Sequence, residues 1–320
     1  MSICAFMEKH YRHFNARETL AAAKGYRKFV DNGGAMMVSL AGAMSTAELG
    51  VSLAEMIREG KVHAISCTAA NLEEDLFNLF AHNEYKVIEN WRALSVQDEV
   101  DLLESGYNRV TDTCIPESVM MHMQSRLVKY WKEAADKGES YFPFEYMFKI
   151  LDEPDLKKHY QIPVEHSWMI AAKEAGIPVF SPGIEDSTLG NMFTARVMDG
   201  TVKSHHALKS GTAQMQFLVE WYKRVSKDRS IGFFQIGGGI AGDFAICAVP
   251  LIIQDLEEEI SRWSYFCQIS DAETSYGGYS GAVPNEKITW NKLTATAPKY
   301  MIHSDACIVA PLIFAYVLGQ

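Results

Sequence analysis

The sequence predicts an α/β fold built on a doubly wound, largely parallel β-sheet. Short apolar runs, turns and amphipathic helical segments follow one another repeatedly, which is the pattern of βαβ units. The chain has 320 residues, of which 48% are hydrophobic and 22% charged, so it can bury a sizeable core. No internal repeat or low-complexity linker divides it. We therefore expect a single domain over residues 1–320.

The first βαβ unit is the clearest. AMMVSLAG (35–42) predicts a buried strand, and either Ser45 or Thr46 can cap the following helix, TAELGVSLAEMIREG. VHAISCT (62–68) predicts the second strand. The helix NLEEDLFNLFAHN (71–83) follows, with acidic residues in its first turn, where the helix dipole favours them.

The same rhythm returns in the second half of the chain. Further strands are expected at GIPVFSP (176–182), SIGFFQIGGG (230–239), YFCQIS (265–270) and KYMIHSD (299–305). The middle is more charged and reads as helical, with VQDEVDLLESG and SVMMHMQSRLVKYWKEAADKG among its segments. We expect a helical insertion at about 96–166 within the same domain.

Composition excludes some partners. The formal net charge of -10 disfavours nucleic acid, because phosphate binding needs a basic face. The charged start MSICAFMEKHYRHF and the lack of a long apolar run indicate a cytoplasmic protein without a membrane partner. The six cysteines have no metal-binding spacing, and the adjacent His205 and His206 point apart, so we expect no metal.

Two glycine-rich or small-residue segments follow predicted strands. Gly237, Gly238 and Gly239 lie where a doubly wound sheet brings its backbone close to a ligand, although the spacing is not GxGxxG. Taken alone, such a triplet after a strand is more often a tight turn than a cofactor site. CTAANLEED (67–75) opens a helix with free N–H groups, and its acidic residues can be simple helix-start acids.

The loop at 274–293, TSYGGYSGAVPNEKITWNKL, combines Glu286, Trp290 and Lys292. A carboxylate and an aromatic face together suit a cationic substrate. A desolvated lysine can lose its proton and attack an imine or carbonyl carbon. The alternative is a surface lysine beside a core tryptophan.

SGAVPNEKITWNK (280–292) is similar to the lysine motif of the deoxyhypusine synthase family. CTAANLEEDL, IPVFSPGIEDSTLGNM, GFFQIGGG and SDACIVAPL also match that family, in its order, from about Ala35 to the end of the chain. The resemblance implies a homotetramer with NAD and a polyamine substrate at subunit interfaces. It also implies a reaction: spermidine is oxidised with NAD, its aminobutyl group forms an imine on the lysine, and an acceptor amine takes that group before reduction.

Residue by residue, the resemblance makes Lys292 the imine-forming nucleophile and Glu286 and Trp290 polyamine contacts. The NAD site would be lined by Thr68, Ala69, Glu73, Glu74, Asp186, Gly238, Gly239, Ala272 and Asp305.

Three substrate positions depart from the family pattern. Asn191 and Tyr279 each replace an aspartate, and Asp243 replaces a catalytic histidine. We expect Asn191 and Tyr279 to contact the substrate still, and Asp243 to take the catalytic position. An aspartate can act as a base there only if burial raises its pKa.

These changes point to an altered donor or acceptor. We expect NAD-dependent aminobutyl transfer to a small amine, as in homospermidine synthesis. The alternatives are a deoxyhypusine synthase acting on a protein lysine and a catalytically silent regulatory homologue. An NAD-consuming deacylase ranks last, because its histidine motif is not apparent.

Overall fold

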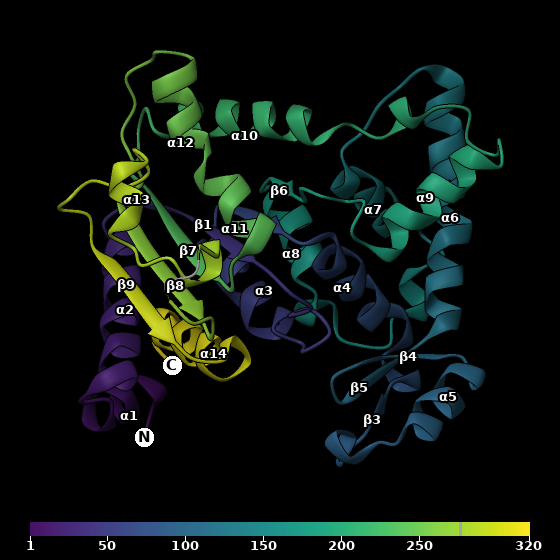
Figure 1. Ribbon diagram of the computed structural model, residues 1–320, viewed down its shortest axis with the longest axis horizontal. Helices are drawn as coiled ribbons and strands as arrows, with labels where there is room; N and C mark the ends of the chain where they lie inside the picture. The colour runs from purple at the N-terminus through teal and green to yellow at the C-terminus, as the bar shows by residue number, and fades with distance from the viewer. Residues whose placement is uncertain (275–276) are drawn as a thin grey trace.

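The computed structural model describes residues 1–274 and 277–320 and has a six-stranded parallel sheet at its centre (Figure 1). The strand order is β6-β2-β1-β7-β8-β9, and every neighbouring pair is parallel. The strands are β1 (Ala35–Leu40), β2 (Ala64–Cys67), β6 (Val179–Phe180), β7 (Ile231–Ile236), β8 (Tyr265–Ser270) and β9 (Lys299–His303). All six lie within the runs expected from the sequence, and the predicted fold class is confirmed.

The chain builds this sheet outward from its middle in two directions. It runs from β1 through β2 to β6, then returns to place β7 on the other side of β1 and continues to β8 and β9. β1 and β7 pair along their whole length, from Ala35 with Ile231 to Leu40 with Ile236. The carboxyl ends of β1 and β7 therefore form the point where the strand order reverses, which is where open α/β sheets bind ligands.

Helices cover both faces of the sheet, and successive strand residues point into separate cores. In β1, Met36 and Val38 join one core, whereas Ala35 and Met37 join the other. The first core is covered by α2 (Phe14–Asp31), α3 (Gly50–Arg58), α4 (Ala69–Ala81), α8 (Trp168–Ala175) and α14 (Ala306–Leu318). The second is covered by α10 (Gly211–Val225), α11 (Gly239–Ile246) and α12 (Ala248–Pro250).

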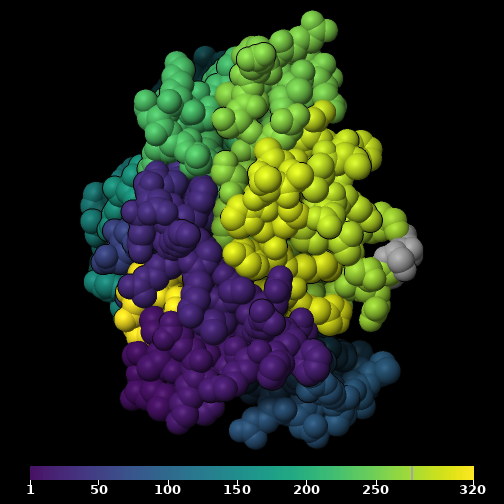
Figure 2. Space-filling view, turned by 90° about the vertical axis from the view of Figure 1, so that its left-hand side faces the viewer, coloured from purple at the N-terminus to yellow at the C-terminus, as the bar shows by residue number. Residues whose placement is uncertain are grey.

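The two ends of the chain meet on one side of the molecule. Figure 2 shows the purple N-terminal segment beside yellow C-terminal residues, and the Cys4 amide donates to the Gln320 carbonyl over 2.9 Å. Here α1 (Ile3–His10) packs on α14. Among the described residues, no helix is long and apolar enough to span a membrane.

The segment from 96 to 166 contains more than the helices expected there. It has α5 (Val96–Glu104), α6 (Glu117–Lys137) and α7 (Pro143–Leu151), but also a hairpin of β4 (Tyr107–Val110) and β5 (Thr113–Pro116). Together with β3 (Lys86–Val87), this hairpin forms a three-stranded antiparallel sheet. The hairpin was not predicted, because its two-residue turn lacks the glycine that usually marks such turns. Thr111 adopts the required positive φ of 58° instead.

The loop after β1 also differs from expectation. The helix predicted from Thr46 begins only at Gly50, because Ser45 and Thr46 are held by α4 rather than capping α3. The Ser45 amide donates to Asn71 Oδ1 over 2.7 Å, and the Asn71 side-chain amide donates to the Leu40, Ala41 and Gly42 carbonyls at 2.8–3.2 Å. Asn71 thus fixes the carboxyl end of β1.

We predict that Asn71→Ala lowers the free energy of unfolding by about 2–4 kcal/mol, because several buried polar groups lose their partner at once. Urea denaturation measures this. Asn83→Ala is the matched control: its side chain is exposed and should change stability by less than about 0.5 kcal/mol. Equal effects of the two substitutions would contradict the role given to Asn71.

Candidate active site

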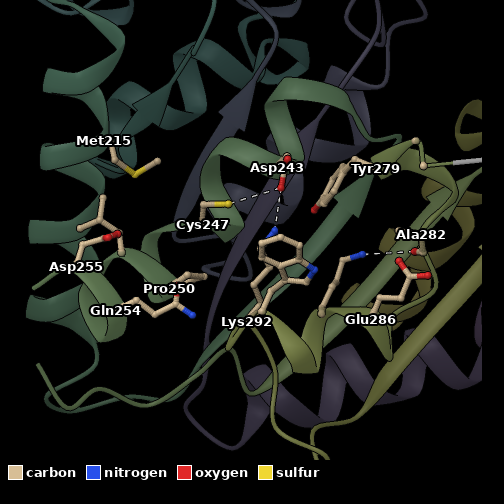
Figure 3. A pocket seen from close by; sticks show the side chains of 15 residues that line it. Met215, Asp243, Cys247, Pro250, Gln254, Asp255, Tyr279, Ala282, Glu286 and Lys292 are labelled. Atoms are coloured by element: carbon tan, nitrogen blue, oxygen red, sulfur yellow. Dashed lines mark hydrogen bonds and ion pairs between the residues drawn. The ribbon is translucent and has the colours of Figure 1, made fainter. Parts of the chain in front are cut away.

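A pocket of about 730 Å³ opens between α10 to α12 and the segment that leads through α13 (Glu286–Thr289) to Lys292 (Figure 3). The structure brings five of the residues expected at the substrate site to its walls. These are Asp243, Tyr279, Glu286, Trp290 and Lys292.

Lys292 is buried, with 7% of its surface exposed, and its amine points into the pocket (Figure 3). Its backbone is fixed on both sides: its amide donates to the Lys287 carbonyl over 3.0 Å, and its carbonyl accepts from the Trp263 amide over 3.2 Å. The preceding Asn291 has a φ of 59°, and its side chain accepts from Arg262 over 2.6 Å. The turn after α13 therefore sets the position of the lysine.

Asp243 on α11 is the partner of this lysine. Its Oδ1 lies 2.9 Å from Lys292 Nζ, although 49 residues separate the two in sequence. The same oxygen accepts from the Cys247 thiol over 3.6 Å. The Asp243 side chain is 47% exposed, so water reaches the aspartate, whereas the lysine is largely buried.

Tyr279 forms the wall beside the pair. Its hydroxyl donates to Gln235 Oε1 over 2.7 Å, and the centre of its ring lies 5.4 Å from Lys292 Nζ. Burial, helped by the nearby Asp243 charge, raises the pKa of Tyr279 above its ordinary value. A Cβ at Gly242 would lie 2.8 Å from Gln235 Oε1 and 3.2 Å from the tyrosine ring. A larger residue at position 242 would therefore displace Gln235 or Tyr279, so this wall of the pocket requires glycine there.

Glu286 and Trp290 lie at the open side of the pocket. Glu286 is the first residue of α13 and Trp290 follows its last residue, so one short helix presents both. The tryptophan is 64% exposed. A carboxylate beside an open indole face can hold an ammonium group by charge pairing and cation–π contact.

Lys287 also lines the pocket, although the sequence did not mark it as a site residue. Only 3% of it is exposed, and its Nζ lies 3.5 Å from both Gln268 Oε1 and the Ala282 carbonyl oxygen. Burial, followed by the charge of Lys292, lowers its pKa to about 8. Because α13 is so short, its sequence has no apolar periodicity, and it did not indicate which of its side chains face inward.

Most residues expected at the cofactor site lie at one edge of the sheet, because they follow the carboxyl ends of parallel strands. Thr68 and Ala69 follow β2, Asp186 follows β6, Gly238 and Gly239 follow β7, Ala272 follows β8, and Asp305 follows β9.

The backbone after β7 leaves room for a ligand. Gly239 has a φ of 56°, and nothing lies within 4 Å of the place where its Cβ would be. Gly238, by contrast, is buried against Ser280, and a Cβ on it would lie 2.1 Å from Ser280 Oγ. The helix N-termini at Thr68 and Gly238 add N–H groups that suit a pyrophosphate. This edge fits a dinucleotide such as NAD.

Glu73 and Glu74 face inward in this chain. Glu73 accepts from the Thr188 and Leu189 amides, at 3.1 and 2.9 Å, and so caps α9 (Thr188–Met198). Glu74 accepts from the Thr46 amide over 3.3 Å. Burial raises the pKa of each carboxyl to about 7. Both acids thus hold the loops around the expected cofactor site, and direct contact with NAD stays a prediction.

Asn191 is not among the residues that line the pocket in the described part of the chain. It lies on the exposed side of α9, and its side-chain amide donates to the Ser187 carbonyl over 2.9 Å. The structure thus does not bring Asn191 together with the other expected substrate residues, and its contact with substrate stays a prediction.

Comparisons with known proteins find relatives over nearly the whole chain. The family model of deoxyhypusine synthase matches residues 3–317. The chain is 30% identical to a "Deoxyhypusine synthase-like protein" of Nostoc punctiforme, covering 92% of this chain and 74% of that one. It is 25% identical to a "Probable deoxyhypusine synthase 1" of Archaeoglobus fulgidus, covering 96% and 90%. The crystal structure of a "putative deoxyhypusine synthase" from Entamoeba histolytica matches with a TM-score of 0.58 at 12% identity, covering 98% and 91%.

The raised pKa of Glu73 predicts how stability changes with pH. The unfolded carboxyl ionises near its ordinary value of 4.5, whereas the folded one keeps its proton until about 7. The free energy of unfolding therefore falls as pH rises through this window, by about 1–3 kcal/mol for this group. Glu73→Gln cannot ionise at this position. Urea denaturation should therefore show that its free energy of unfolding rises relative to that of the parent between pH 5 and 8. Exposed Glu59→Gln is the control, and parallel pH curves for Glu73→Gln and the parent would exclude this effect.

Proposed function

The chain belongs to the deoxyhypusine synthase family, and on this premise we propose that it is an NAD-dependent aminobutyl transferase. It takes the aminobutyl group from spermidine or a related polyamine, holds it as an imine on Lys292, and passes it to a small amine. Homospermidine-type synthesis is the model reaction.

The Lys292–Asp243 pair inside the pocket is the main support for this proposal. A lysine amine must lose its proton before it attacks a carbon. Asp243 lies within hydrogen-bond reach and holds this amine in place, but its side chain is 47% exposed, so the burial that an aspartate base requires is absent. The aspartate takes the place of the family's histidine. An intact, positioned amine also supports an active enzyme over a silent homologue.

The other groups of the pocket suit a polyamine. Glu286 and Asp255 line its walls, and they supply carboxylates for ammonium groups beside the exposed Trp290. Asp255 ends a π-helical turn, Leu251–Asp255, a feature often found at functional sites. Bound NAD would accept a hydride from the donor and later return it. Thr68, Gly238 and Gly239 would hold it at the sheet edge.

The reaction proceeds by exchange of amines on one carbon. Oxidation of the donor's C–N bond gives an imine, and the free amine of Lys292 attacks its carbon and releases 1,3-diaminopropane. The acceptor amine then displaces Lys292 from the same carbon. Reduction of the final imine gives the product, so no net oxidation occurs.

We include a homotetramer with active sites at subunit interfaces in this proposal. Trp290 and Ile240, which flank the pocket and the glycine turn, are 64% and 51% exposed in the single chain. Asn191 lies outside the pocket. A partner subunit would cover these side chains and keep water from the imine.

Borohydride trapping tests the proposed function. The protein is incubated with NAD and spermidine, reduced, digested and analysed by mass spectrometry, and we expect an aminobutyl adduct on Lys292. Lys292→Arg is the matched variant, because arginine keeps the charge that pairs with Asp243 but stays protonated and cannot form the imine. The variant should show no adduct while still binding NAD.

An adduct on a different lysine would contradict the role of Lys292. If no adduct forms although NAD binds, spermidine is not the donor.

A further inference from the structure

Lys287 is a second amine in the pocket that the proposed reaction does not use. It lies one turn before Lys292, whose amide donates to the Lys287 carbonyl. The two ammonium groups approach the same Tyr279 ring, with Nζ atoms 4.9 and 5.4 Å from its centre. Lys287 is therefore fixed close to the reacting amine.

This buried cation has no acidic partner. Within residues 1–274 and 277–320, no carboxylate forms an ion pair with Lys287, and its contacts are two neutral oxygens at 3.5 Å and the Phe266 and Tyr279 rings. Buried charges in proteins are normally paired. Because its pKa of about 8 lies above 7, the amine is mostly protonated at neutral pH despite its burial.

The acids of the pocket are engaged or placed elsewhere. Asp243 pairs with Lys292. The charges of Glu286 and Asp243 reach Lys287 and favour its protonated form, but within the described residues neither carboxylate forms an ion pair with it. The wall beside Lys287 is neutral, since Tyr279 donates its proton to Gln235 and Gln268 is an amide. Within the described residues, Lys287 is thus a buried cation of the pocket without a carboxylate in contact, and a ligand can supply one.

We propose that Lys287 binds a carboxylate of the acceptor, so that the acceptor is a small amine carrying a carboxyl group, such as a diamino acid. This inference rests on the proposed function and specifies its acceptor. The carboxylate pairs with Lys287, while the acceptor's amine attacks the imine carbon on Lys292. The C–N bond to Lys292 breaks, the lysine leaves as a free amine, and the reduced product is an N-(4-aminobutyl) amino acid.

Matched pairs of ligands that differ only in the carboxyl group test this inference. They are 2,4-diaminobutanoate with 1,3-diaminopropane, ornithine with putrescine, and lysine with cadaverine. Isothermal titration calorimetry of the NAD-loaded protein should show at least tenfold tighter binding of the amino acid in the pair of best-fitting length. The charge contact adds to binding only when a carboxylate is present.

Lys287→Met keeps the length of the side chain and removes its charge. In this variant the amino acid should lose at least tenfold in affinity, whereas the matched diamine should bind no more weakly. Lys287→Arg should keep most of the preference. If Lys287→Met does not fold, the parent protein's comparison of matched pairs decides alone.

Equal or tighter binding of every diamine to the parent protein would overturn the inference, and so would an unchanged preference in Lys287→Met. The result is separable from the proposed function. A Lys292 adduct without a carboxylate preference leaves aminobutyl transfer standing and removes the role of Lys287. A carboxylate preference without any adduct keeps the role of Lys287 and removes spermidine as the aminobutyl donor.

Discussion

Parallel pairing of β1 with β7 is the constraint on which the site depends. Because the strand order reverses there, the loops after β1 and β7 separate, and the backbone at Gly239 is accessible at the sheet edge. The same crossing directs the chain from β7 straight into α11, which carries Asp243 over the pocket. Asn71 then fixes the end of β1 by four hydrogen bonds to backbone groups. One topological feature thus positions both the expected cofactor site and the partner of the lysine.

Charge distribution distinguishes this pocket. The resemblance to deoxyhypusine synthases implies aspartates at the positions of Asn191 and Tyr279, and here the second is a neutral phenol hydrogen-bonded to Gln235. Lys287 adds a buried positive charge on the adjoining wall. The neutral Tyr279 and the cationic Lys287 both favour an anionic group at this wall. That wall therefore suits a carboxylate on the acceptor, while Glu286 and Asp255 still offer carboxylates to the polyamine donor.

The sequence predicted the six central strands, because each is a short apolar run followed by glycine or polar residues. It also predicted the pocket set of Glu286, Trp290 and Lys292, through a resemblance in motif order. It did not predict the β4–β5 hairpin, whose turn uses Thr111 rather than glycine. It also did not predict the burial of Lys287, because that depends on the packing of α13 against β8. The sequence also did not predict that Glu73 and Glu74 accept hydrogen bonds from Thr188 and Thr46, because these partners lie far away in the chain; their contact with NAD stays a prediction.

Isotope tracing tests the central claim most directly, namely that hydride removal and return occur on one carbon bound to Lys292. Spermidine carrying two deuterium atoms on the carbon that becomes the imine is incubated with the protein, NAD and an unlabelled acceptor. The account predicts a product that keeps both deuterium atoms, because the transferred one returns from the same cofactor molecule. A product in which hydrogen replaces one deuterium atom, or net accumulation of reduced cofactor without product, would contradict it.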